Sequence, residues 1–230
     1  MAREFKGIIT ALITPFKEDG GLHEEALKAV IGFQVKKGVN GFFLCGTAGQ
    51  GAIMRVDQRK RVVEVAVEEA SGKVTLIAHV GAPDTETAIE LAKHAEKAGV
   101  DAVGCVAPYY YTPDEEALVK HFEKVASAVE LPVFVYNIPR HTGINIKPDL
   151  LLRIARIKNV AGVKDSSRDF IQVLEILEKV PKDFTVIVGT DAYILPALIM
   201  GVKGAITAYS NPFPELYVDM YREFLAGNLE

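Results

Sequence analysis

The feature that most constrains the fold is a regular alternation of short apolar, β-rich runs with longer stretches of helical periodicity. The two patterns indicate strands and amphipathic helices respectively. Eight runs with strand character occupy Gly7–Phe16, Gly41–Gly46, Val74–Val80, Ala102–Pro108, Pro132–Asn137, Val160–Asp165, Phe184–Thr190 and Gly204–Tyr209. The helical stretches that follow them cover about His23–Lys37, Val56–Ala70, Thr85–Ala98, Asp114–Val129, Lys147–Ile157, Arg168–Glu178, Tyr193–Met200 and Pro214–Ala226.

The order and character of these segments favour one fold. The strand runs are almost wholly apolar, which is typical of parallel strands covered on both faces. Strict βα alternation implies parallel strands joined by right-handed crossovers. Eight such units in 230 residues predict a single (β/α)8 TIM barrel spanning residues 1–230. An open doubly wound sheet remains the alternative, because counting units does not establish closure.

Charge and composition limit the partners. With 49% apolar and 24% charged residues, the chain resembles an ordinary globular protein. The net charge is −4 without a basic stripe, so we expect no nucleic-acid or membrane partner. No apolar run reaches the roughly 18–20 residues that span a bilayer, and the first residues lack a signal-peptide pattern. The expected location is the cytoplasm.

Cysteine and histidine usage argues against a metal or disulfide framework. Cys45 and Cys105 both lie within apolar runs, so two buried reduced thiols are expected. The five histidines lie in separate segments without ligand spacing. Neither a Walker A loop nor a GxGxxG motif follows a strand. We therefore expect no metal and no cofactor.

Candidate site residues come from the carboxyl ends of the strands, where barrel active sites lie. The loops in question are Gly46–Gly51, Pro108–Tyr111, Tyr136–Gly143, Lys164–Ser167 and Gly189–Asp191. Lys164 ends the apolar run Val160–Val163, and a lysine is almost never buried without a role. Desolvation lowers a lysine pKa and frees its amine for Schiff-base formation with a ketone. The alternative is a structural ion pair with Asp165 or another carboxylate.

Other residues of these loops have two readings each. Tyr136 ends the strand before Lys164 and can transfer protons there, or it can simply plug the barrel mouth. The glycines around Thr47 can bring backbone N–H groups to an anion, or form an ordinary turn. Arg140 and His141 can clamp a carboxylate, or remain solvated. The tyrosines Tyr109–Tyr111 suit a site wall or an interface.

Four motifs in order, GTAGQ, PYYYTP, YNIPRHTG and GVKDSS, resemble those of the dihydrodipicolinate synthase / N-acetylneuraminate lyase family. The resemblance extends over essentially the whole chain and implies a class I pyruvate aldolase on a TIM barrel. It makes Lys164 the Schiff-base lysine, Tyr136 the proton relay above the imine, and Thr47 the link to a second tyrosine. That second tyrosine is Tyr110, which in this family enters a neighbouring subunit, so a dimer or tetramer is expected.

The same resemblance assigns the substrate contacts. The backbone around Thr47 and Ala48 would hold the pyruvate carboxylate, and the backbone of Ile206 would contact the pyruvate moiety. Gly189, Arg140 and His141 are expected to line the substrate site. Three positions depart from the family pattern: Ala48 replaces a second hydroxyl, Gln50 replaces a glutamate, and His141 stands where synthases carry an arginine for the acceptor. Val56 and Arg59 stand where histidines often form the lysine-feedback pocket of some synthases.

The implied reaction is condensation of pyruvate with an aldehyde, as in dihydrodipicolinate synthase, or the reverse cleavage. A 2-keto-3-deoxy-sugar-acid aldolase and an N-acetylneuraminate lyase are the alternatives within the family. A catalytically silent keto-acid-binding or assembly barrel is the alternative of another class. The chain is shorter than family members, which predicts that the C-terminal helical extension is absent, that apolar surface on the last helices is exposed and that assembly is weaker.

Overall fold

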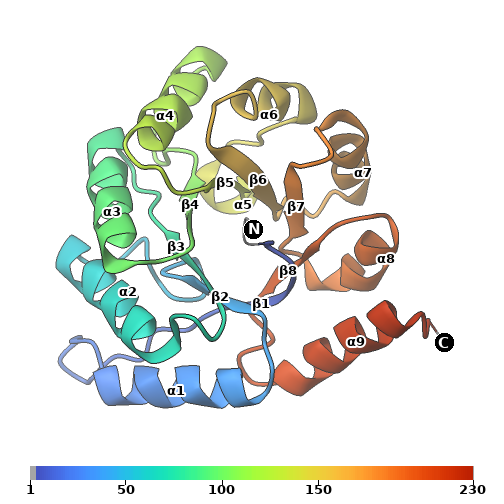
Figure 1. Cartoon of the computed structure of the whole chain (residues 1–230). Helices are drawn as coiled ribbons and strands as arrows, with labels where there is room; N and C mark the ends of the chain where they lie inside the picture. Colours follow the sequence, from blue (N-terminus) through green and yellow to red (C-terminus); the bar gives the residue numbers. More distant parts are fainter. Residues whose placement is uncertain (1–3, 230) are drawn as a thin grey trace.

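The computed structural model describes residues 4–229, and within them eight parallel strands close into a barrel in sequence order (Figure 1). The strands are β1 (Gly7–Ala11), β2 (Gly41–Leu44), β3 (Thr75–His79), β4 (Ala102–Val106), β5 (Val133–Asn137), β6 (Val160–Asp165), β7 (Thr185–Val188) and β8 (Gly204–Thr207). Closure is direct, because β1 pairs with both β2 and β8. The predicted TIM barrel is confirmed, and the open sheet is excluded.

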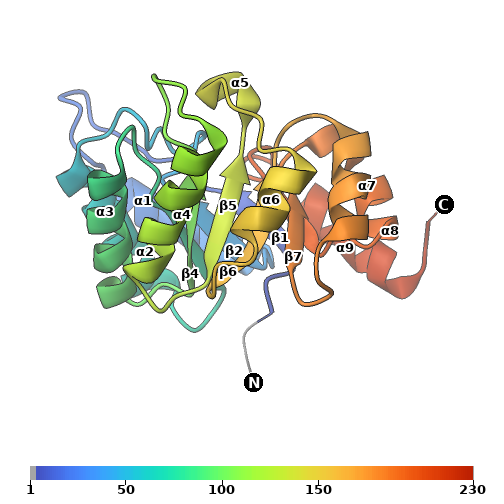
Figure 2. The same ribbon diagram turned by 90° about the horizontal axis from the view of Figure 1, so that it is seen from above.

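Helices form a ring around the barrel, one after each strand (Figure 1). They are α1 (Glu24–Lys36), α2 (Val56–Ala70), α3 (Thr85–Ala98), α4 (Glu115–Ser127), α6 (Pro148–Ile154), α7 (Phe170–Lys179), α8 (Ile194–Ile199) and α9 (Pro214–Ala226). Two short elements are additions that periodicity did not predict: α5 (Pro139–Thr142) and the 3-10 turn η1 (Asp191–Tyr193). Figure 2 shows α5 at the end of the barrel toward which β5 points.

Side chains on each strand alternate between two separate cores, because successive residues of a strand point to opposite faces. On β2, Phe42 packs outward against the helices, whereas Phe43 points into the barrel. On β5, Val135 points outward and Tyr136 inward. The interior therefore holds its own layer of apolar side chains, on which the residues at the barrel mouth rest.

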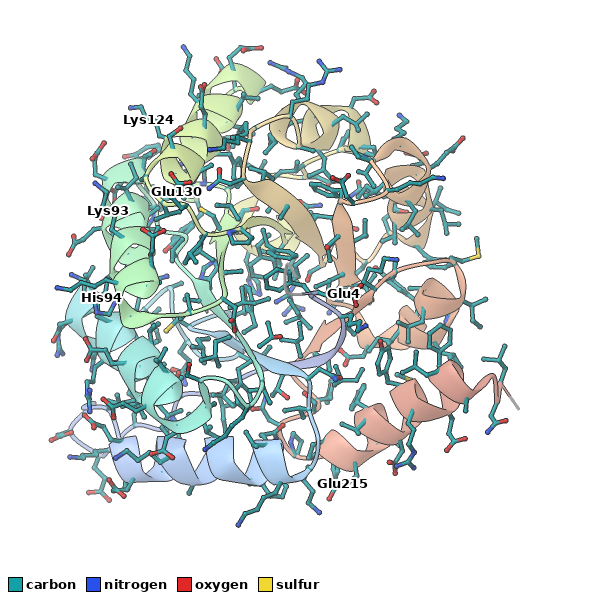
Figure 3. All side chains as sticks on the ribbon, viewed as in Figure 1. Glu4, Lys93, His94, Lys124, Glu130 and Glu215 are labelled. Atoms are coloured by element: carbon teal, nitrogen blue, oxygen red, sulfur yellow. The ribbon has the colours of Figure 1, made fainter. Side chains whose placement is uncertain are left out.

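Pairs of polar and charged side chains join neighbouring helices on the outside of the ring. The His94 imidazole on α3 lies 2.9 Å from the Glu64 carboxylate on α2. At the start of α9, Glu215 pairs with Lys37 at the end of α1. Figure 3 shows His94 and Glu215 on the outer rim of the molecule. Such exposed pairs contribute little each, so the barrel is held mainly by its two apolar cores.

Helix α9 packs less closely than the others. Its apolar face contacts the core through Tyr217, Tyr221 and Phe224, while Leu216 and Leu225 are each about two-thirds exposed. The helix ends where expected, with Gly227 in the left-handed conformation as its C-cap. No helix within residues 4–229 is long and apolar enough to cross a membrane.

Of the boundaries that differ from the sequence-based expectation, three have a local cause in the structure. β1 ends at Ala11 rather than Phe16, because Phe16 instead bridges antiparallel to Leu22. The stretch predicted as one helix from Tyr193 begins with η1, and only α8 is α-helical. The helix predicted from Arg168 begins at Phe170, since the Asp169 side chain accepts a hydrogen bond from the Gln172 N–H and caps α7.

Candidate active site

Lys164 is the central group of the barrel mouth, and strand register sets its position. On β6 it is flanked by the outward-facing Val163, so period-two alternation turns the lysine inward. The β5–β6 register places Tyr136 directly beside it. Lys164 is only 3% exposed. A glycine at 189 on the other side leaves room for its side chain, because a Cβ there would lie 3.1 Å from Lys164 Cε.

Aromatic rings surround the lysine amine. Lys164 Nζ lies 3.9 Å from the ring centre of Tyr136 and 4.1 Å from that of Phe43. Both contacts are of cation–π type and stabilise the protonated amine. Burial nevertheless lowers the pKa of the Lys164 ammonium, and the Tyr136 phenol and the Asp191 carboxylate only partly oppose that shift. The free amine is thus more populated near neutral pH than in an exposed lysine.

The alternative that Lys164 is a structural partner of Asp165 is wrong. The Asp165 carboxylate is fully buried and faces the other side of β6. It accepts hydrogen bonds from the side-chain amides of Asn137 at 2.9 Å and Gln172 at 3.1 Å, and from Ser167. No ion pair of Lys164 occurs among the residues that the structure describes, so its amine is available for chemistry.

Thr47 brings a hydroxyl to Tyr136 from the opposite part of the barrel mouth. The Thr47 Oγ1 and Tyr136 Oη atoms are 3.2 Å apart, and either can donate. The loop that carries Thr47 turns tightly: a Cβ at Gly51 would lie 1.8 Å from the Cys45 carbonyl oxygen. Only glycine fits there, which fixes the loop against the end of β2.

A cavity of about 620 Å³ opens above Lys164, a size suited to a small-molecule substrate. Of the residues singled out from the sequence, it is lined by Lys164, Tyr136, Thr47, Ala48, Ile206, Gly189 and Arg140. Asp191, Ser166, Tyr193 and Arg168 line it as well. The structure thus brings together seven of the predicted site residues around one space.

His141 lies in a neighbouring cavity of about 320 Å³, which shares Thr47 and Tyr136 with the first. Its ring accepts a hydrogen bond at 3.0 Å from the Arg140 guanidinium. Partial burial, and then the charge of Arg140, lower the pKa of His141. A neutral imidazole therefore faces this side of the Tyr136–Thr47 pair at neutral pH.

Tyr110 does not join the site of its own chain. It is 88% exposed, lines neither cavity and stacks edge-to-face on Tyr111 at 5.1 Å. Tyr109, by contrast, lines the smaller cavity. The tyrosine cluster therefore divides into one wall residue and an exposed aromatic pair.

Sequence reasoning missed Phe43 and Arg168. The signal for Phe43 was available, since it alternates with Phe42 in a strand, but the choice of which one faces inward needs the barrel. The sequence analysis placed Arg168 at the start of a predicted helix. Its position at the cavity became visible only in the tertiary structure. Within residues 4–229 no group of three or more His, Cys, Asp or Glu side chains is arranged to hold a metal ion.

A (β/α)8 barrel with a desolvated lysine beside a tyrosine at its carboxyl end has the groups that a class I aldolase requires, because such an enzyme works through a lysine Schiff base. The sequence also matches the family model described as the dihydrodipicolinate synthetase family over residues 4–230. The chain belongs to this family of pyruvate-dependent lyases.

Individual relatives agree with that assignment. The chain is 38% identical over 226 residues to the 4-hydroxy-tetrahydrodipicolinate synthase of Methanothrix thermoacetophila, covering 98% of this chain and 76% of that protein. It superposes on dihydrodipicolinate synthase from Aquifex aeolicus with a TM-score of 0.93 and 35% identity, covering 97% and 76% of the two chains. The superposition on YagE from E. coli K12, solved in complex with pyruvate, has a TM-score of 0.95 at 31% identity and covers 98% of this chain and 77% of YagE.

Proposed function

We propose that this protein condenses pyruvate with an aldehyde, in the manner of a dihydrodipicolinate synthase, through a Schiff base on Lys164. The observation that carries the proposal is a lysine 3% exposed, unpaired with any described carboxylate, at the floor of a 620 Å³ cavity. Burial lowers the pKa of its ammonium, which supplies the nucleophilic amine.

The chemistry follows from the groups around that amine. The neutral Lys164 amine attacks the keto carbon of pyruvate, and loss of water leaves a protonated imine. This cation sits against the rings of Phe43 and Tyr136, where the amine nitrogen lies in this structure. Loss of a methyl proton gives an enamine, whose carbon then attacks the carbonyl carbon of the aldehyde. The aldehyde oxygen takes up a proton, and hydrolysis of the imine returns the lysine.

Tyr136 and Thr47 are the groups we assign to proton transfer. Their hydroxyls are 3.2 Å apart, so a proton can pass between them without movement of the backbone. We assign the pyruvate carboxylate to the backbone around Thr47 and Ala48, and the contact at the far wall to Ile206. Ala48 offers no hydroxyl, so this carboxylate depends on backbone N–H groups.

The native assembly we propose is a homo-oligomer in the cytoplasm. Support comes from Tyr110, which is exposed and held in a left-handed conformation at φ 85°. Such a conformation costs energy in a tyrosine and is typical of functional loops. Tyr110 lies in the loop after β4, at the barrel end that carries the site, and we propose that it enters the site of a second copy. The two cysteines, both free and buried, fit a reducing compartment.

Borohydride reduction in the presence of pyruvate tests the proposal. We expect a pyruvyl adduct on the intact protein, located to Lys164 by peptide analysis and absent from Lys164→Ala. Lys179→Ala is the matched control, since Lys179 pairs on the surface with Asp149 and should leave trapping unchanged. A folded wild-type protein that forms no adduct would refute the proposal and favour a silent, ligand-binding barrel.

A further inference from the structure

Residues in left-handed backbone conformation gather at the barrel end that holds Lys164. Apart from glycine, the described residues with positive φ are Cys45 (55°), Gln50 (59°), Tyr110 (85°) and Arg168 (66°). Each follows the carboxyl end of a strand, in the loops after β2, β4 and β6. Residues with side chains rarely adopt this conformation, and where they persist at a site the strain points to function.

Arg168 owes its conformation to a tight turn between β6 and α7. The Ser167 N–H donates to Asp165 Oδ1 at 3.0 Å, and the Asp169 N–H donates to Ser167 Oγ at 3.1 Å. The Asp169 carboxylate is engaged as the cap of α7. Both acidic neighbours of Arg168 are therefore used by the turn, and no ion pair of its guanidinium occurs among the described residues.

Arg168 lines the cavity above Lys164 together with Arg140. The Arg140 guanidinium donates to the His141 ring, which carries no negative charge. Asp191 is the acidic residue among those lining this cavity, and it accepts a hydrogen bond from the Thr207 hydroxyl. The cavity lining thus includes two guanidinium groups on exposed residues, neither in an ion pair with a described carboxylate, against the one carboxylate of Asp191. This arrangement gives the cavity an electrostatic bias toward anionic ligands.

We infer that Arg168 is a specificity-determining residue, which with Arg140 binds an anionic group at the far end of the aldehyde acceptor. The inference rests on the proposed function, since pyruvate occupies the lysine end of the cavity. The planar guanidinium fits a carboxylate or a phosphate in a two-pronged geometry. An aldehyde that bears such a group would place its carbonyl carbon beside the enamine carbon of the lysine-bound pyruvate and its charge at the arginines.

Two matched pairs of aldehydes test the inference with wild-type enzyme and pyruvate. Succinic semialdehyde carries a carboxylate that its methyl ester lacks, and glyceraldehyde 3-phosphate carries a phosphate that glyceraldehyde lacks. We expect wild-type kcat/KM to favour the charged member of at least one pair by about tenfold or more. The pair that shows the preference tells carboxylate from phosphate.

Variants at position 168 separate charge from backbone conformation. Arg168→Ala should lose about tenfold in kcat/KM on the charged aldehyde, mainly through KM, with little change on its neutral partner. Arg168→Gly should show the same loss although glycine fits a positive φ, and Arg168→Lys should retain part of the preference. Arg222→Ala removes an exposed arginine of α9, which pairs with Asp219, and should behave as wild type.

The outcomes are distinguishable from those of the proposed function. A wild-type protein that forms no pyruvate adduct on Lys164 overturns the proposed function, and this inference with it. An adduct accompanied by equal rates on both members of each pair overturns the inference alone. So does a charge preference that survives in Arg168→Ala and Arg168→Gly, because the anion would then be bound elsewhere.

Discussion

Replacing Gly189 by alanine should misplace the reactive lysine, and the structure sets the size of the effect. A Cβ at this position would lie 2.1 Å from Ser166 Oγ and 3.1 Å from Lys164 Cε. The first distance is impossible for a real side chain, so Ser166 must rotate or the end of β7 must shift. The second requires the lysine chain to move by a few tenths of an ångström.

Two magnitudes follow from these contacts. Overfilling a packed site by one methyl group costs about 1–3 kcal/mol of unfolding free energy. For a chain of this size, each kcal/mol lowers Tm by about 2–4 °C. A displacement of 1 Å can reduce catalysis by about 10²-fold, so a shift of a few tenths should slow pyruvate adduct formation by up to about tenfold.

Thermal unfolding and the time course of borohydride trapping measure the two effects separately. Adding Ser166→Ala to Gly189→Ala removes the closer contact, so stability should recover while trapping remains slow. Gly32→Ala is the control, because a Cβ at this position of α1 meets nothing within 4 Å. Alanine there should raise stability by up to about 1 kcal/mol and leave trapping unchanged.

The reasoning would be refuted by a Gly189→Ala protein with wild-type Tm and wild-type trapping. A loss of stability that Ser166→Ala does not relieve would show that another contact is responsible. A trapping rate restored by Ser166→Ala would mean that the lysine is displaced through Ser166 rather than by direct contact with the new methyl group.

Further expectations concern His121 and Tyr110. Burial lowers the pKa of His121 to about 4, so the unfolded state takes up a proton near pH 6.5 while the folded state does not. The free energy of unfolding should therefore fall by about 3 kcal/mol as the pH drops from 6.5 to 4. Denaturant titrations at a series of pH values measure this fall, which should be smaller in His121→Gln. For Tyr110, chains carrying Lys164→Ala and chains carrying Tyr110→Ala, co-expressed, should recover activity above that of either variant alone. Failure to recover activity would contradict the exchange of this tyrosine between copies.

The alternation of patterns was sufficient to predict the architecture. Apolar runs such as Val160–Val163 cannot be exposed, and eight of them separated by amphipathic stretches have few solutions other than a parallel barrel. The same run made Lys164 a candidate for function, since a lysine at the end of a buried strand requires an explanation. The thiols of Cys45 and Cys105 were also predictable, and the structure confirms both as buried and free.

Only the tertiary structure decided what surrounds that lysine. Tyr136 became its neighbour through the β5–β6 register, and Phe43 reached it from a strand across the barrel. These contacts depend on closure and stagger, which no local pattern contains. Arg168 shows the same limit. The helical pattern included it, but α7 begins at Phe170 after the Asp169 cap, and Arg168 lines the cavity instead. Local sequence fixes which segments form strands and helices, whereas long-range pairing determines which side chains meet.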